Sequence, residues 1–171
     1  MEKVIKVLNE MKKRKLIEDY AIGGGIAAIF YAETILTYDL DIFFISSSAQ
    51  EGKLITLSPI YDYFKDKGCR IDKEHIIIEG MPVQFIPVYN ELVKEAVENA
   101  REIKYKGTKT KVLRAEYLIS IMLQTFRPKD KERIIRLLDE SKIDENYLKG
   151  ILKKFKLDEK FESFKKVYYE K

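Results

Sequence analysis

The stretch Tyr20–Phe44 reads YAIGGGIAAIFYAETILTYDLDIFF, and our prediction of the fold starts from it. It contains a glycine turn, a short apolar segment, and two carboxylates, Asp39 and Asp41, inside an apolar run. Side chains alternate between the faces of a β-strand, so we expect Asp39 and Asp41 to stand together on one face. Two buried like charges are unfavourable unless a cation neutralises them, and carboxylate oxygens suit Mg²⁺ or Mn²⁺. The pattern therefore predicts a divalent metal site.

This pair of carboxylates also has a purely structural explanation. Charged residues on an edge strand protect a sheet against aggregation. The residues that follow Asp41 are apolar, which favours a buried strand and hence the metal site over the edge strand.

The glycine turn consists of Gly23, Gly24 and Gly25, between an expected strand and an expected helix. Glycine lets backbone N–H groups approach an anion at the start of a helix. A tight turn with close helix packing is the alternative explanation. The turn has neither the GK[ST] of a Walker loop nor the GxGxxG of a dinucleotide site.

Together these residues resemble the signature of the nucleotidyltransferase superfamily that includes DNA polymerase beta. The signature joins Gly24 and Gly25, across residues 26–38, to Asp39-Leu40-Asp41. The segments GGIAAIFY and TYDLDIFF are similar to sequences of the small prokaryotic branch that includes AbiEii-type toxin nucleotidyltransferases. The resemblance implies that the glycine turn holds the phosphates of an NTP and that the two aspartates hold two Mg²⁺ or Mn²⁺ ions. It also implies transfer of a nucleoside monophosphate to a hydroxyl, with release of pyrophosphate.

Two positions depart from the family pattern. Many members carry a third carboxylate on a later strand, where this chain has Gln84. Gln84 can offer a carbonyl oxygen to a metal or substrate but cannot act as a general base; alternatively it only satisfies a buried polar position. Glu74 and Glu79 are weaker candidates for the missing charge. Many relatives also have an arginine where this chain has Ile35, whereas Thr37 is kept and could hydrogen-bond near Asp39.

A basic cluster follows in TFRPKDKERI, at an expected helix start: Arg127, Lys129, Asp130 and Arg133. We expect its cations to reach a triphosphate and Asp130 to cap the helix or orient them. A second basic stretch, Lys104, Lys106, Lys109 and Lys111 with Tyr105 interleaved, reads as a solvated loop, with RNA contact as the alternative. His75 and Cys69 are isolated in the sequence, so we assign them no role.

Composition limits the class of protein. The 171 residues are 46% hydrophobic, enough for a compact core, and the net charge of +4 is too small to indicate nucleic-acid binding. One cysteine excludes an internal disulfide and favours the cytoplasm. We expect no signal peptide and no membrane-spanning segment.

The periodicity predicts an α+β fold, a small mixed β-sheet flanked by helices. The resemblance implies that this is the nucleotidyltransferase fold with a helical C-terminal part. We expect a catalytic core at residues 1–105 and a helical region packing on it at 106–171. The expected helices are 2–17, 27–34, 55–64 with Ser58 as N-cap, 90–102, 114–125, 129–139 and a tail from 146. The expected strands are 21–22, 36–45, 76–78 and 83–88, with a polar loop at 46–52 and a lysine-rich loop around Gly107.

Two functions fit these features. The first is a metal-dependent nucleotidyltransferase with Asp39, Asp41 and Gln84 at the catalytic centre; Gly23, Gly24, Gly25, Thr37, Arg127, Lys129, Asp130 and Arg133 would bind the nucleotide. Its acceptor could be RNA, a protein or a small molecule, and an antitoxin partner cannot be inferred from the sequence. The alternative, which Gln84 supports, is a nucleotide-binding or partner-binding module that keeps the fold with impaired turnover.

Overall fold

The computed structural model describes residues 1–47 and 56–170. Its described strands form one seven-stranded mixed sheet in the order β3-β4-β5-β2-β1-β7-β6. The centre of the sheet is built from β1 (Ile17–Gly23), β2 (Leu40–Ser46) and β5 (Met81–Pro87). β2 runs antiparallel to β1 and parallel to β5. The expected α+β fold with a mixed sheet is confirmed.

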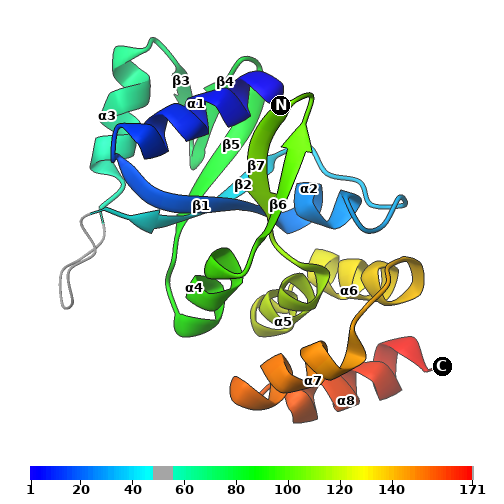
Figure 1. Ribbon diagram of the computed structural model, residues 1–171. Helices are drawn as coiled ribbons and strands as arrows, with labels where there is room; N and C mark the ends of the chain where they lie inside the picture. Colours follow the sequence, from blue (N-terminus) through cyan, green and yellow to red (C-terminus); the bar gives the residue numbers. More distant parts are fainter. Residues whose placement is uncertain (48–55, 171) are drawn as a thin grey trace.

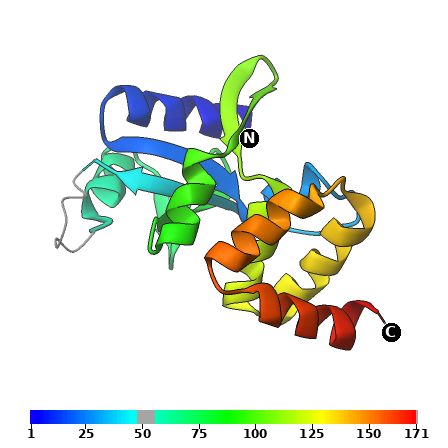
Figure 2. The ribbon, with the colours of Figure 1, turned by 60° about the horizontal axis from the view of Figure 1, so that its bottom comes forward.

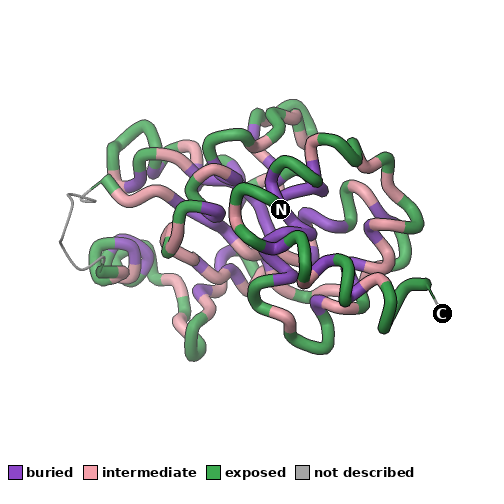
Figure 3. Tube along the Cα trace, turned by 90° about the horizontal axis from the view of Figure 1, so that it is seen from below, coloured by how far each residue is buried: buried purple, intermediate pink, exposed green. Residues whose placement is uncertain are grey.

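Helices cover both faces of the sheet (Figure 1). α1 (Glu2–Lys13) and α3 (Ser58–Asp66) lie on one side, and α4 (Glu91–Glu98) and α5 (Ala115–Thr125) lie on the other. Three further helices, α6 (Pro128–Glu140), α7 (Glu145–Lys154) and α8 (Asp158–Phe164), gather with α5 below the sheet (Figures 1 and 2). A short π-helical turn, η1 (Lys165–Tyr169), follows α8. Buried segments run through the middle of the molecule, and exposed ones surround them (Figure 3).

The side chains of β2 alternate between the two faces of the sheet. Leu40, Ile42 and Phe44 are buried on the side of α1 and α3, where Phe44 and Phe64 both contact the ring of Phe85. Asp41 therefore points to the opposite face, toward α5. The sheet thus has one largely apolar face and one face that combines apolar and charged groups.

The region around the glycine turn differs from the expected boundaries. The first helix ends at Lys13, because Lys15 adopts a left-handed φ of 58° and Ile17 already pairs with Ser46 in the sheet. α2 occupies Gly24–Ile29 in place of 27–34, so the helix begins inside the glycine turn. β2 begins at Leu40, which leaves Asp39 just before the strand instead of within it.

Other boundaries also differ. Ser58 is the first residue of α3, whose N-cap is Leu57, so the predicted Ser58 cap is wrong. α4 ends at Glu98, since the Asn99 amide donates a hydrogen bond to the carbonyl of Glu95 and ends the helix there. Residues 48–55 of the expected polar loop and helix lie outside the described residues.

The expected lysine-rich loop is a β-hairpin. β6 (Arg101–Tyr105) and β7 (Thr108–Val112) pair around Gly107, which has a φ of 82°. The hairpin projects from the body of the molecule (Figure 2). β7 joins the central sheet next to β1, so the sheet extends to Val112 and the described helical part begins at Ala115.

The expected hairpin at 76–78 and 83–88 is confirmed as β4 (His75–Ile78) and β5, with a short edge strand β3 (Arg70–Asp72) added beside β4. The two helices expected at 114–125 and 129–139 are confirmed as α5 and α6.

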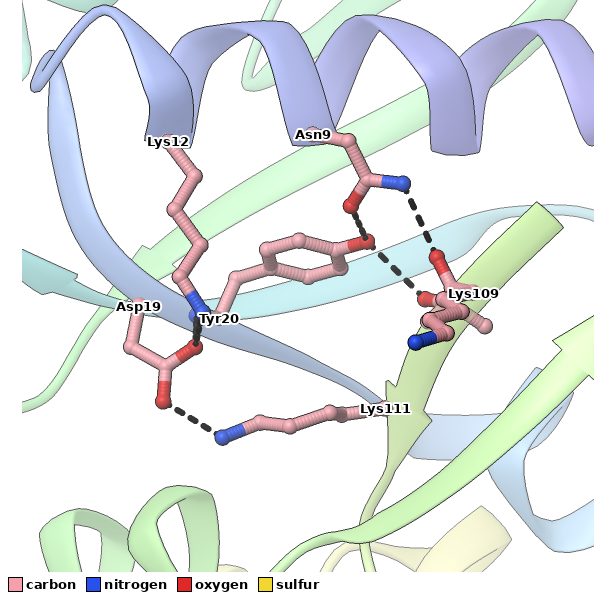
Figure 4. Close-up of polar contacts among 7 residues, drawn as sticks. Asn9, Lys12, Asp19, Tyr20, Lys109 and Lys111 are labelled. Atoms are coloured by element: carbon pink, nitrogen blue, oxygen red, sulfur yellow. Dashed lines mark hydrogen bonds and ion pairs between the residues drawn. The ribbon is translucent and has the colours of Figure 1, made fainter.

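A polar network ties β7 and α1 to β1; we define it as Asn9, Lys12, Asp19, Tyr20, Lys109, Thr110 and Lys111. Figure 4 shows these contacts and labels each residue except Thr110. The Tyr20 hydroxyl lies 2.8 Å from Asn9 Oδ1 and 3.0 Å from Thr110 Oγ1. Asp19 accepts from Lys12 at 3.0 Å and from Lys111. The ladder between β1 and β7 has a single registered pair, Ile22 with Val112, so these side chains hold the two strands together where backbone bonds are few.

Candidate active site

The start of β2 places Asp41 in the middle of three aligned strands. Asp41 pairs with Gly23 of β1 and with Gln84 of β5. Gln84 pairs in turn with His75 of β4. Partners in a sheet project to the same face, so Asp41, Gln84 and His75 form a row on the face toward α5.

Asp41 is half-buried, and its Oδ1 atom is buried with no hydrogen-bond partner among the described residues. Burial, followed by the charge of Asp39, raises the pKa of the Asp41 carboxyl from 3.8 to about 6. The cations Lys129, Arg133 and Arg127 act in the opposite direction but do not outweigh burial. A buried carboxylate oxygen without a partner is rare in proteins and calls for a ligand.

Asp39 has a different environment. Its Oδ1 accepts from the Thr37 hydroxyl at 3.3 Å, and its Oδ2 lies 3.2 Å from His75 Nε2. Burial opposes ionisation, but the hydrogen bonds from His75 and Thr37 outweigh it and lower the pKa of Asp39. The two neighbouring carboxyls therefore have pKa values shifted in opposite directions.

The glycine turn fits closely around these residues. Gly24 has a φ of +59°, and a Cβ atom added there would lie 2.0 Å from Asp41 Oδ2. A Cβ atom on Gly25 would lie 2.7 Å from both Thr37 Oγ1 and Arg133 Nη2. On Gly23 it would lie 2.3 Å from the ring of Phe43. Each glycine is required by close approach, and Gly24 also by its backbone conformation.

The basic cluster lies at the start of α6. Asp130 is fully buried there and accepts from Thr125 Oγ1 at 2.8 Å, from the Arg127 backbone at 2.9 Å and from Arg127 Nε at 2.8 Å. These hydrogen bonds outweigh burial and lower the pKa of Asp130. Asp130 therefore caps the helix and orients Arg127, as expected, while Lys129 remains close enough to act on Asp41.

These elements enclose a cavity of about 440 Å³ between the sheet and the helices α5 and α6. Its described lining is Gly24, Asp39, Asp41, Phe43, Gln84, Ile86, Tyr89, Leu113, Leu118, Ile121, Met122, Thr125, Arg127, Lys129, Asp130 and Arg133. Carboxylates and cations face one another across one part of it, and apolar side chains line the rest. The sequence-predicted residues thus meet around one cavity, while Gly23, Gly25 and Thr37 support its lining from behind.

His75 was missed by sequence reasoning. It is separated from Asp39 by 36 positions, and only the pairing of β4 with β5 and of β5 with β2 brings the two together. Alternation within His75–Ile78, where Ile76 and Ile78 are buried, was the one signal that His75 faces the other side of the sheet. Glu79, by contrast, lies at the β4–β5 turn and pairs with Lys3. Neither Glu79 nor Glu74 is among the described residues that line the cavity.

The site fits a divalent cation that also binds a substrate. No group of three or more His, Cys, Asp or Glu residues among the described residues could hold a metal alone. Mg²⁺, however, is commonly held by one or two carboxylates together with substrate phosphates and water. Asp39 and the unpartnered Oδ1 of Asp41 supply two such ligands, and the cations of α6 suit the phosphates.

Comparison with known proteins supports the fold. No protein-family model matches the sequence, and no curated protein matches it. An antigenic nucleotidyltransferase-like protein from Paracoccidioides brasiliensis superimposes with a TM-score of 0.52 at 17% identity, over 80% of this chain and 74% of its own. The solution structure of the antibiotic-resistance factor ANT(2'')-Ia gives 0.53 at 14% identity, over 98% and 96% of the two chains.

A crystal structure of ANT(2'')-Ia in complex with adenylyl-2''-tobramycin gives a TM-score of 0.51 at 18% identity, over 96% of each chain. These similarities show that the chain has a nucleotidyltransferase-like fold. Among the described helices, none combines the length and apolar character needed to cross a membrane.

Proposed function

We propose that this protein is a metal-dependent nucleotidyltransferase that transfers a nucleoside monophosphate from an NTP to a hydroxyl acceptor. The observation that carries the proposal is the buried, unpartnered Oδ1 atom of Asp41, beside Asp39 and in the same cavity as the cations of α6. Most buried polar atoms in folded proteins are hydrogen-bonded, so the missing donor supports a ligand at this oxygen.

Each part of the cavity has a role in this proposal. Asp39 and Asp41 hold Mg²⁺ or Mn²⁺, which supplies neutralisation of the phosphate charge and alignment of the attacking and leaving oxygens. Backbone N–H groups at Gly24 and Gly25 contact the phosphates. Lys129 and Arg133 bind the triphosphate tail, and Arg127, held by Asp130, adds a third positive charge.

The reaction exchanges one phosphorus–oxygen bond for another. The acceptor hydroxyl oxygen bonds to the α-phosphorus as the bond to the departing pyrophosphate breaks. The hydroxyl proton passes to solvent, because Gln84 cannot accept it. Gln84 instead offers its carbonyl oxygen beside Asp41, with which it is in register.

The nature of the acceptor stays open, and RNA, a protein side chain and a small molecule remain candidates. The solved complex of ANT(2'')-Ia contains an adenylylated aminoglycoside, which makes adenylyl transfer to a sugar hydroxyl a first reaction to test. The resemblance to AbiEii-type toxins, an antitoxin partner and a cytoplasmic location stay predictions.

Calorimetric titration of each NTP with Mg²⁺ or Mn²⁺ tests the proposal, using wild type and the Asp39→Asn, Asp41→Asn double variant. We expect metal-dependent binding that the double variant loses. Asp19→Asn is the matched control, because it removes an aspartate charge from the polar network on another part of the sheet. Absence of NTP binding by the wild type would contradict an active nucleotidyltransferase.

The alternative function is a nucleotide-binding or partner-binding module with impaired turnover, which the replacement of the third carboxylate by Gln84 favours. Pyrophosphate release distinguishes the two functions. Metal-dependent NTP binding without release, across RNA, protein and small-molecule acceptors, would favour the module. Release that Asp41→Asn abolishes would favour the enzyme.

A further inference from the structure

His75 contacts this site although we assigned it no role from the sequence. It lies in the row that β4, β5 and β2 form, beside Gln84 and across from Asp41. Its Nε2 atom is 3.2 Å from Asp39 Oδ2, a hydrogen-bonding distance. Its side chain is 24% exposed and that of Asp39 is 32% exposed, so water competes only partly for this contact.

The chemistry of the two groups fixes the direction of the hydrogen bond. An ionised carboxylate only accepts hydrogen bonds, so the imidazole must donate through Nε2–H. A neutral imidazole with its proton on Nε2 can do this as well as a charged one. The opposite ring nitrogen, Nδ1, faces Glu74, whose Oε1 is 3.9 Å away.

The strand ladders do not fix the backbone of Asp39, so side-chain hydrogen bonds orient its carboxylate. Asp41 sits within β2, where the ladders to β1 and β5 fix its backbone. Asp39 precedes the first strand residue, Leu40, and has no registered partner on either neighbouring strand. Two side chains hold its carboxylate instead: Thr37 donates to Oδ1 and His75 to Oδ2.

We propose that His75 is a positioning residue that holds Asp39 in the orientation in which it binds the divalent cation. The inference rests on the proposed function, since it assumes that Asp39 is a metal ligand. Hydrogen-bond partners of ligating carboxylates fix their orientation, and their loss typically lowers metal affinity by about 10- to 100-fold. This role would support a centre that has Gln84 where many relatives have a third carboxylate.

A matched pair of substitutions tests the role. His75→Leu removes the donor and keeps a side chain of similar bulk. His75→Gln keeps a donor, because the amide Nε2 of glutamine is as many bonds from the backbone as the Nε2 of histidine. Affinity for Mn²⁺ alone is measured by electron paramagnetic resonance on wild type and both variants, with circular dichroism and unfolding midpoints to show that each is folded.

We expect His75→Leu to weaken Mn²⁺ binding by about 10- to 100-fold and His75→Gln to restore most of the affinity. Pulsed measurements on the wild type should show no coupling between Mn²⁺ and an imidazole nitrogen. A purely structural role for His75 would lower the unfolding midpoint and leave the Mn²⁺ affinity of the folded variants unchanged.

Three results would overturn the inference while leaving the proposed function intact. They are equal Mn²⁺ affinity of wild type and His75→Leu, no rescue by His75→Gln, and a nitrogen coupling, which would make His75 a ligand itself. Absence of Mn²⁺ binding by the wild type would overturn both the inference and the metal site, so the two failures are distinguishable.

Discussion

The polar network around Asp19 and the cavity around Asp41 place an aspartate on neighbouring strands in opposite electrostatic environments. Asp19 accepts from Lys12, from Lys111 and from the Tyr20 backbone, and these bonds outweigh burial to lower its pKa. Asp41 has no partner for Oδ1, and burial raises its pKa to about 6. The two carboxyls therefore differ in their supply of hydrogen-bond donors, and their pKa values shift in opposite directions.

The cavity itself contains a second instance of this contrast. Asp130 is fully buried, yet four donor atoms from Thr125 and Arg127 satisfy it. Burial therefore does not distinguish the two kinds of aspartate. The number of hydrogen-bond donors around the carboxyl group distinguishes them, and mutation can change that number.

The largest expected effect is the loss of transfer activity in Asp41→Asn. Metal-ion stabilisation of a transition state is worth several kcal/mol, so kcat/KM for pyrophosphate release should fall by about 1,000-fold or more. Asp19→Asn should keep activity near wild type when assayed below its unfolding temperature. Comparable losses in both variants would show that Asp41 acts through stability and not through the metal.

Gly24→Ala is expected to have the next largest effect. The added methyl group would lie 2.0 Å from Asp41 Oδ2, so the carboxylate has to move. Misplacing a catalytic group by about 1 Å can lower kcat/KM by about 100-fold.

Gly80→Ala is the control for this change, because Gly80 also has a left-handed φ, +78°, but open space around its Cα. Both variants carry a backbone penalty of about 1 kcal/mol, measurable by urea unfolding. Only Gly24→Ala should lose metal and NTP binding. An equal loss in Gly80→Ala would indicate that backbone strain alone accounts for the effect.

Stability should change in opposite directions for the two aspartates in metal-free buffer. The folded pKa of Asp41 is raised from 3.8 to about 6, so its ionisation destabilises the fold. At pH values above about 6, Asp41→Asn should raise the free energy of unfolding by up to about 3 kcal/mol. This gain should shrink as the pH falls from about 6 to about 4, because the wild-type carboxyl becomes protonated.

Asp19→Asn should lower the free energy of unfolding by about 1 to 3 kcal/mol at neutral pH, because it leaves the Lys111 ammonium without its carboxylate partner. The folded pKa of Asp19 is lowered, so its contribution is present above 3.8 and is lost as the pH falls through the folded value. Urea unfolding across this pH range measures both effects. Destabilisation by Asp41→Asn at neutral pH would contradict the contrast between the two regions.

The smallest expected effect is a gain in Gln84→Glu. The new carboxylate would stand in register with Asp41 and add a third oxygen charge at the metal site. We expect Mn²⁺ affinity and the rate of pyrophosphate release to rise by about 10-fold, the order of a single charge-assisted contact. Gln124→Glu on α5, outside the cavity lining, is a matched control. A fall in Mn²⁺ affinity would mean that Gln84 serves as a neutral group.

Much of the site could be predicted from the sequence because its residues are close together along the chain. The glycine turn and the aspartates fall within one strand–helix–strand unit, and Arg127 to Arg133 fall within one helix start. Local rules of glycine conformation, alternation and capping suffice for such segments. The predicted boundaries of α2 and β2 were less accurate. Those boundaries depend on the β1–β2 ladder and on the packing of Thr37 against Gly25.

The basic hairpin shows the limit of local patterns. Arg101–Val112 is rich in lysine, and its sequence alone favours a loop. It becomes two strands because Asp19, Tyr20 and Asn9, about 90 to 100 positions away along the chain, supply partners for its inward side chains and backbone. Propensity yields to tertiary partners in such segments.

By itself, the sequence predicted that Gly24, Gly25, Asp39 and Asp41 form one site, from the alternation that pairs the two aspartates and from the resemblance of their spacing to a family signature. Only the tertiary structure decided the rest. It aligned Gln84 and His75 with Asp41 through strand pairing, and it left Asp41 without donors while surrounding Asp19 and Asp130 with them. The physical reason is that the ionisation and ligand-binding capacity of a carboxylate depend on the atoms within hydrogen-bonding reach, and folding alone brings those atoms together.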